Sequence, residues 1–289
     1  MTQIIQTTVN GLTNGSLYSL VALSLVIITR ASGVLNFGVG YMATFVGVFS
    51  ANFWVGGSFV TLIVSLLLAG GLGVACFLLA VNLAEKKGAG HASLGIVALG
   101  FGIVIEYFCG KLWLQQGYSP PPLIDGGILL GDVAISNMRI MTVVVAIGVF
   151  VLISLIFEKS MLGWALESIA FRRDTALLYG VNIFLILGCV WFLGGMLAGL
   201  AGILQAPIYQ ISLPVSIPLA VKGFTAVVIG GTKKIEYALY SSFAIAFLES
   251  TFVTLLSSVY SNALIFCVLF VGLATKPEGV FMRRKKLAR

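Results

Sequence analysis

Residues 158–182 read EKSMLGWALESIAFRRDTALLYGVN, and this stretch separates two long apolar runs. Leu162, Leu166 and Ile169 recur at helical spacing, so we expect a short amphipathic helix on the membrane surface. Such a helix is either a contact site for a cytoplasmic partner or an interfacial loop helix without one, and the residues alone leave both open. The charged residues of the stretch are Glu158, Lys159, Glu167, Arg172, Arg173 and Asp174.

The chain as a whole is too apolar for a soluble protein. Its 289 residues are 59% hydrophobic and only 9% charged, whereas an average soluble domain is about 25% charged. Its apolar runs are continuous rather than alternating, so helices are expected instead of a barrel. We predict one all-α polytopic membrane domain over residues 1–289, with about eight or nine transmembrane or re-entrant helices, since about 20 apolar residues cross the hydrocarbon.

Charge and cysteine content exclude other classes of protein. The net charge of +7 does not indicate nucleic-acid binding, because the basic residues lie in short loops and in a basic tail at 276–289. The four cysteines lie far apart within apolar runs, so neither a disulfide framework nor a metal site is expected. The first residues lack a charged leader and a small-residue cleavage site, so we expect the first span to be retained.

The longest interruption of the apolar pattern is 115–139. It contains three prolines at 120–122 and the turn-forming pair Asp125-Gly126, so we expect an irregular external loop. The expected membrane segments are 9–29, 32–53, 58–83, 92–114, 140–157, 183–206, 219–231, 237–256 and 261–275.

Orientation follows from the distribution of basic residues. With the amino terminus outside and every segment crossing, the cytoplasmic side receives every lysine and arginine except Lys111, Arg139 and Lys222. Segment 219–231 is short for a straight crossing, so it is tilted, partly re-entrant, or begins near Ile211. If it re-enters, the basic tail keeps the carboxyl terminus cytoplasmic and the amino terminus changes side. The prolines expected to break the chain around its start are Pro207, Pro214 and Pro218.

The start of the second segment, 32–40, reads SGVLNFGVG. Its glycines and asparagine weaken a helix, and irregular backbone at membrane depth is tolerated only inside protein or beside a cavity. We expect a broken or re-entrant segment that faces a pathway; the alternative is a glycine-rich packing face. The first segment also starts with small polar residues, which suit contacts between helices. The candidate pathway residues are Asn14, Ser16, Asn36, Phe37, Gly38 and Gly40.

Two carboxylates interrupt apolar runs. Glu106 and Glu249 each lie within an expected span, and a carboxylate in the membrane is a functional candidate by default because it is costly to bury. The alternative is a structural carboxylate paired with another group. His91, the only histidine, is expected in a solvated loop.

Short motifs in a fixed order resemble the permease subunits of branched-chain amino acid ABC importers of the LivH/LivM type. The resemblance extends over nearly the whole chain, and the order of the motifs is more specific than any one of them. The motifs lie at residues 10–25, 33–40, Leu162-Gly163, Ala176, 180–182, 197–204, 222–231, Glu249 and 276–281.

This resemblance implies a division of labour. The chain would form half of a translocation pathway, completed by a second, homologous or identical permease, in a bacterial inner membrane. An external binding protein would deliver the solute, and two cytoplasmic ATPase subunits would grip the helix at 161–179. The chain has no phosphate-binding Gly-x-x-x-x-Gly-Lys-Ser/Thr loop, so it is expected to be no enzyme and to hold no cofactor, with ATP and Mg bound by the ATPases. The expected coupling residues are Leu162, Gly163, Leu166, Glu167, Arg172, Arg173, Asp174 and Gly180.

The expected solute is a branched-chain or other small hydrophobic amino acid. The alternatives are urea, a short amide or another small carboxylate, or a stand-alone secondary transporter or channel that uses Glu106 and Glu249 as ion sites. In place of the family's usual pattern, the coupling stretch has Glu167 and Arg172-Arg173 in nearly inverted charge, and 232–238 reads TKKIEYA. The inverted charge implies a partner ATPase with a matching change in its groove.

Overall fold

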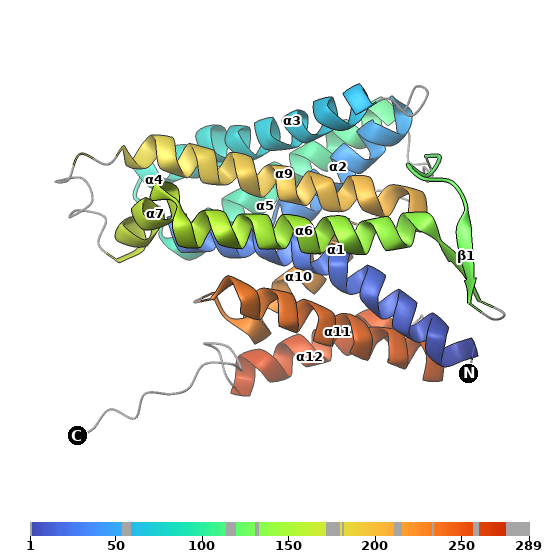
Figure 1. The fold of residues 1–289 in the computed structure, drawn as a ribbon. Helices are drawn as coiled ribbons and strands as arrows, with labels where there is room; N and C mark the ends of the chain where they lie inside the picture. The colour runs from blue at the N-terminus through green and yellow to red at the C-terminus, as the bar shows by residue number, and fades with distance from the viewer. Residues whose placement is uncertain are drawn as a thin grey trace, which may run out of the picture.

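The computed structural model describes residues 2–53, 59–113, 120–130, 133–171, 180, 182–210, 216–232, 234–256 and 260–275. Within this part of the chain, six helical runs are long and apolar enough to cross a membrane, and the helices α2, α10 and α12 are shorter. The fold is therefore the expected helical membrane fold (Figure 1). The helices are α1 Thr2–Ser32, α2 Val39–Asn52, α3 Phe59–Ala75, the π-helix η1 Cys76–Val81, α4 Asn82–Lys86, α5 His91–Trp113, α6 Asn137–Lys159, α7 Met161–Phe171, α9 Ile183–Tyr209, α10 Ser216–Gly230, α11 Ile235–Leu255 and α12 Ser261–Thr275.

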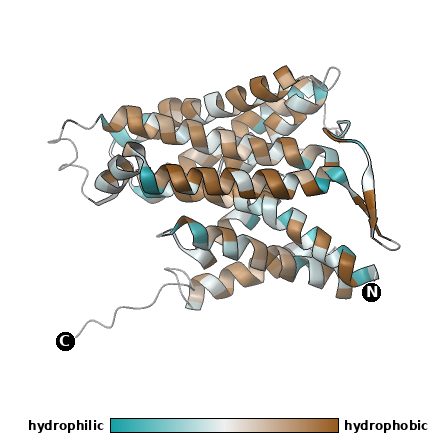
Figure 2. Cartoon of the chain, viewed as in Figure 1, coloured by the Kyte–Doolittle hydropathy of each residue, from teal (hydrophilic) through white to brown (hydrophobic). Residues whose placement is uncertain are grey.

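The two ends of the helical bundle differ. One end carries α4 and the short helix α7, and the other carries the strands β1 and β2 together with the start of α1 (Figure 1); we call them the α7 end and the hairpin end. Apolar residues dominate the long helices between these ends, and hydrophilic residues gather near the helix termini (Figure 2). This distribution is the one that a lipid bilayer imposes on a helical bundle.

Helix α1 lies at the centre of the bundle and packs against α6, α9, α10 and α11. Its Ser24 hydroxyl donates a hydrogen bond of 2.8 Å to the carbonyl oxygen of Gly194 on α9. Near the hairpin end, Thr7 on α1 and Thr254 on α11 share a hydrogen bond of 2.8 Å. Of the small residues expected to suit helix contacts, Gly11 and Gly15 lie against Phe247 and Phe243 of α11, whereas the hydroxyls of Thr13 and Ser16 bond within α1.

Close backbone contacts hold α9 against α2 and α3. A Cβ atom on Gly202 would lie 1.9 Å from the carbonyl oxygen of Ala43, and one on Gly195 would lie 2.3 Å from that of Ala69. Only glycine allows the helix backbones to approach so closely.

Two local expectations were wrong. Residues 115–139 were expected to be irregular, but β1 Gly127–Leu130 and β2 Val133–Ser136 pair as an antiparallel hairpin with Ile128 opposite Ile135. Pro207 was expected to break the chain, but α9 runs through it to Tyr209. Pro207 lacks the N–H that would donate to the carbonyl oxygen of Ile203, and the helix ends two residues later.

The chain crosses the bundle between α9 and α11. Pro207 on α9 borders a cavity at the hairpin end together with Gln6, whereas Thr232, after α10, lies at the α7 end beside Gly163. Helix α10 has 15 residues, which rise only about 22 Å, so it is shorter than a straight crossing of about 30 Å. Gly272, near the end of α12, packs against the end of α10, which lies at the α7 end. The last described residues are therefore at the α7 end, whereas α1 begins at the hairpin end (Figure 1).

Candidate translocation pathway and coupling surface

A break in regular structure separates α1 from α2 and extends from the α7 end into the bundle. Gly33 has a φ of 71° and lies beside the imidazole of His91, where α5 begins, whereas Gly38 lies against the carbonyl oxygen of Ala98. These two points on α5 are seven residues, or about 10 Å, apart along the helix. The expected broken segment is therefore present, and it lies inside the protein as irregular backbone in a membrane must.

Asn36 shapes the turn into α2. Its side chain is 1% exposed, and its Oδ1 atom accepts a hydrogen bond of 3.0 Å from the backbone N–H of Gly38. The next ring, Phe37, meets Phe224 of α10 edge-on at 5.2 Å between centroids. At Gly40 the backbone of α2 touches α10, because a Cβ atom there would lie 2.0 Å from the carbonyl oxygen of Ser216.

The structure therefore brings together Asn36, Phe37, Gly38 and Gly40 at the junction of α2, α5 and α10. Gly38 and Gly40 are packing points, as the alternative interpretation of this segment expects. Of the two candidates on α1, Asn14 is half-buried and Ser16 is fully buried, with its hydroxyl donating to the carbonyl oxygen of Leu12 in the same helix. That the six candidates line a pathway stays a prediction.

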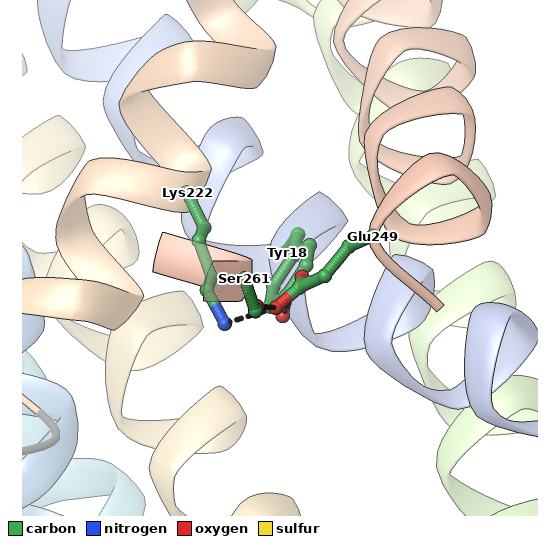
Figure 3. A network of polar contacts seen from close by, with 4 residues as sticks. All are labelled: Tyr18, Lys222, Glu249 and Ser261. Carbon is green, nitrogen blue, oxygen red and sulfur yellow. Dashed lines mark hydrogen bonds and ion pairs between the residues drawn. The ribbon is translucent and has the colours of Figure 1, made fainter. Parts of the chain in front are cut away.

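Glu249 is the centre of a polar network inside the bundle (Figure 3). Its Oε1 atom accepts hydrogen bonds from the Lys222 ammonium at 2.7 Å and from the Ser261 hydroxyl at 2.6 Å. Its Oε2 atom accepts a bond of 2.7 Å from the Tyr18 hydroxyl. The Lys222 ammonium also lies 5.2 Å from the centroid of the Tyr18 ring. One carboxylate thus joins α1, α10, α11 and α12.

Both charged side chains of this network are largely shielded from solvent, at 17% exposure for Lys222 and 6% for Glu249. Glu249 is therefore a structural carboxylate paired with other groups, the alternative stated for an intramembrane carboxylate. Its partners are one cation and two hydroxyl donors. The sequence indicated the carboxylate but not its ion-pair partner, Lys222, which was expected away from the cytoplasmic side. A lysine inside an apolar run was the available signal.

Glu106 differs from Glu249. It lies half-buried on α5, and within the described part of the chain its side chain forms neither an ion pair nor a hydrogen bond. Its neighbours Tyr107 and Phe108 are exposed on the surface of the bundle. The structure thus does not bring the two intramembrane carboxylates into one network.

Helix α7 is amphipathic, as predicted, and packs against α1, α6 and α9. Leu166 and Ile169 are each 5% exposed and belong to the core. Gly163 is also turned inward, because a Cβ atom there would lie 1.8 Å from the carbonyl oxygen of Phe157. The opposite side of the helix exposes Met161 and Trp164, at 90% and 71%.

Of the remaining coupling candidates, only Gly180 lies wholly within the described residues. Gly180 adopts a φ of 75°, which suits a glycine in a turn. Met161 and Trp164 were not among the candidates, although the spacing of Leu162, Leu166 and Ile169 already places Trp164 on the other face of a helix. The candidates outside the described residues are Arg172, Arg173, Asp174 and the side chains of Leu162 and Glu167.

A cavity of about 830 Å³ opens at the α7 end between α7, the ends of α1 and α6, and the start of α11. Its wall carries Arg30, Glu158, Lys234 and Glu236 beside Trp164. No group of three or more histidine, cysteine, aspartate or glutamate side chains that could hold a metal occurs among the described residues.

A helical bundle with a glycine-rich interior break and a surface helix anchored between its spans defines a polytopic helical membrane protein. Residues 7–273 match the family described as the branched-chain amino acid transport system, permease component, and the chain belongs to this family. As a permease component it is the non-catalytic membrane subunit of an ABC transporter, in which the partner ATPases bind ATP.

Two relatives in sequence agree with the family match. The chain is 24% identical over 304 residues to the high-affinity branched-chain amino acid transport system permease protein BraD of Pseudomonas aeruginosa, covering 96% of each chain. It is 23% identical over 300 residues to LivH of Escherichia coli strain K12, covering 95% of this chain and 94% of LivH. The solved structure of PsaBC from Streptococcus pneumoniae in complex with Fab superposes on 94% of this chain and 92% of its own, with 14% identity and a TM-score of 0.48.

Proposed function

We propose that this chain forms half of the translocation pathway of an ATP-driven importer for a branched-chain or other small hydrophobic amino acid. The observation that carries this proposal is the geometry of α7. Leu166 and Ile169 anchor the helix in the core, while Met161 and Trp164 are left exposed on its outer side. A large exposed tryptophan on a firmly anchored surface helix is a suitable contact for a partner protein.

The partner at α7 is an ATPase subunit, and the mechanism is alternating access. Closure of two ATPases on ATP would push α7, and the helices packed against it, α1, α6 and α9, would move with it. Because Gly163 fits tightly against the end of α6, a push on α7 is transmitted to that span without slack. A second permease chain, homologous or identical, completes the pathway, and an external binding protein supplies the solute.

The charge distribution supports an inner-membrane orientation with the α7 end in the cytoplasm. Arg30 lies in the last turn of α1, Lys86 ends α4 and Lys159 ends α6, and all three termini belong to the α7 end. Positively charged residues gather on the cytoplasmic side of membrane proteins. The carboxyl terminus, with the basic tail at 276–289, is then cytoplasmic and the hairpin external.

The solute is proposed from the family and from the chemistry of the break. Residues 33–40 carry no charged side chain, and Asn36 and Phe37 combine an amide with an aromatic ring. Weak contacts of this kind let a small solute with an apolar side chain pass. Urea, a short amide or a small carboxylate would be carried by a permease of the same family with a different pathway lining.

The proposal is tested by purifying the chain from native membranes in mild detergent and identifying the proteins that accompany it. ATPase subunits should co-purify, and Arg172→Glu with Arg173→Glu should release them. The matched control is Lys86→Glu with Lys87→Glu, which makes the same change of charge at the same end, at α4, which within the described residues does not pack against α7. If both double variants lose the ATPases, the loss is due to the changed charge of this end and not to a contact at Arg172 and Arg173.

Uptake by the reconstituted complex then identifies the solute. Leucine, isoleucine, valine and alanine should be taken up only with ATP, and urea, acetamide and acetate should not. A chain that purifies alone and still moves solute in liposomes would sink the importer proposal. In that case Glu106 and Glu249 would be the first residues to test as ion sites.

A further inference from the structure

The cavity at the α7 end is large enough for a small ligand. Its volume of about 830 Å³ lies within the range of about 300–1,000 Å³ found for ligand sites. Its deep wall is apolar, because Ile27, Ala31 and Ile235 are buried side chains of the core. Charged and aromatic side chains surround this apolar floor, which is the general layout of a small-molecule site.

The charged side chains around the cavity form no ion pairs with one another. Arg30 and Lys234 are basic, Glu158 and Glu236 are acidic, and no oppositely charged pair among the four lies within 4.0 Å. The Lys234 ammonium lies 5.8 Å from the centroid of the Tyr237 ring. The hydroxyl of Ser154, which also lines the cavity, is buried without a hydrogen-bond partner.

A ligand with both charges would complete this arrangement. A carboxylate could be held by Arg30 and Lys234, and an ammonium group by Glu158 and Glu236, through charge-assisted hydrogen bonds. A short aliphatic side chain would cover the apolar floor. A free α-amino acid has this chemistry.

We infer that this cavity binds a small hydrophobic amino acid from the cytoplasmic side and thereby slows import. The inference rests on the proposed function, in which such a solute accumulates at this end. Gly163, Trp164 and Leu166 of α7 lie on one wall together with α1 and α6, and the start of α11 forms the other wall. A ligand that binds both walls favours the arrangement in which they are close, so it opposes the displacement of α7 that drives transport.

Binding is measured on the full chain in nanodiscs made of phosphatidylglycerol, by calorimetry with L-leucine. Leucinol, which lacks the carboxylate, and 4-methylpentanoate, which lacks the ammonium group, should each bind at least about tenfold more weakly, as expected for loss of one charged hydrogen-bonding group. Glu236→Gln and Lys234→Met should each weaken leucine binding about three- to tenfold. The controls Lys159→Met and Asp125→Asn, which lie outside the cavity, should leave the affinity unchanged.

Three results would overturn the site. If Glu236→Gln and Lys234→Met leave the leucine affinity unchanged, leucine binds elsewhere, for example in the translocation pathway. Loss of leucine affinity when phosphatidylethanolamine replaces the anionic lipid would assign the cavity to a lipid headgroup. Loss of leucine affinity on adding the ATPase subunits would assign it to their docking.

Transport separates this inference from the proposed function. In proteoliposomes with the complete importer, internal leucine should slow leucine uptake, and Glu236→Gln should relieve that inhibition. Normal uptake that internal leucine does not slow would overturn the inference and leave the proposed function intact. Absence of ATP-driven leucine uptake would overturn the proposed solute, whatever the binding experiment gives.

Discussion

Lys222 of α10 and Glu249 of α11 form an ion pair of 2.7 Å in the interior of the bundle. Tyr18, which lies halfway along α1, and Ser261, which begins α12, donate to the same carboxylate. A charge in a membrane interior is tolerated when it is paired and hydrogen-bonded. The ion pair and its two hydroxyl donors therefore fix the relative positions of four helices, among them the short α10 and α12.

Removing either charge should destabilise this chain. Glu249→Gln leaves the Lys222 ammonium without its counter-ion, and Lys222→Met leaves a buried carboxylate with only two hydroxyl donors. Each change should lower the free energy of unfolding by about 3 kcal/mol. Unfolding by SDS in mixed micelles measures this, with Lys111→Met at the exposed end of α5 as a control that stays within about 0.5 kcal/mol.

The double variant Lys222→Met with Glu249→Gln checks the cause. Because it removes both charges, it should be more stable than the sum of the single effects predicts. Simple additivity would show that the two side chains contribute separately and that the ion pair is not the source of the stability.

Gly40→Val should disrupt the contact between α2 and α10. A Cβ atom at this position would lie 2.0 Å from a backbone oxygen of Ser216, which cannot rotate away as a side chain can. We expect a loss of stability of about 1–3 kcal/mol and slower uptake. Gly100→Val on α5 is the matched control, because a Cβ atom there meets nothing within 4 Å. Equal melting temperatures for the two variants would contradict the packing role.

Trp164 and Leu166 should have separable roles on α7. Trp164→Ala removes an exposed side chain, so the chain should stay within about 0.5 kcal/mol of its original stability but bind the ATPases at least about tenfold more weakly, as a central aromatic contact does. Leu166→Ala removes a buried side chain and should lower stability by about 2–5 kcal/mol. Pull-down of the ATPases and thermal unfolding, measured on both variants, distinguish these effects. Unchanged ATPase binding by Trp164→Ala would remove this residue from the proposed interface.

The membrane-spanning helices were predictable because each corresponds to a local run of apolar residues. The ninth expected segment, 261–275, coincides with α12, and the fourth, 92–114, differs from α5 by one residue at each end. The hairpin was missed because prolines and the Asp-Gly pair dominated the interpretation of 115–139. Two short β-branched and aliphatic runs separated by Gly131-Asp132 were the available signal.

The polar network and the cavity were not predictable in the same way. Tyr18 and Glu249 are separated by 231 positions, and no periodicity within one helix reveals which distant helix will face it. The cavity likewise combines the ends of α1 and α6 with the start of α11. Such sites depend on tertiary packing, whereas the break at 33–40 was predictable because its glycines and asparagine act on their own backbone.

Asn36→Leu is expected to slow uptake while leaving the protein folded. The substitution removes the acceptor of the 3.0 Å bond from the Gly38 N–H, so a buried donor is left unpaired at a cost of about 1–3 kcal/mol. Asn36→Ser keeps an acceptor that can close a similar turn but shortens the side chain. If Asn36 only shapes the turn, Asn36→Ser should restore uptake; if its amide also contacts solute, uptake stays slow in a correctly folded chain. Initial uptake rates, compared with the amount of folded permease by size-exclusion chromatography, decide between these roles, and normal uptake by Asn36→Leu would remove Asn36 from the pathway.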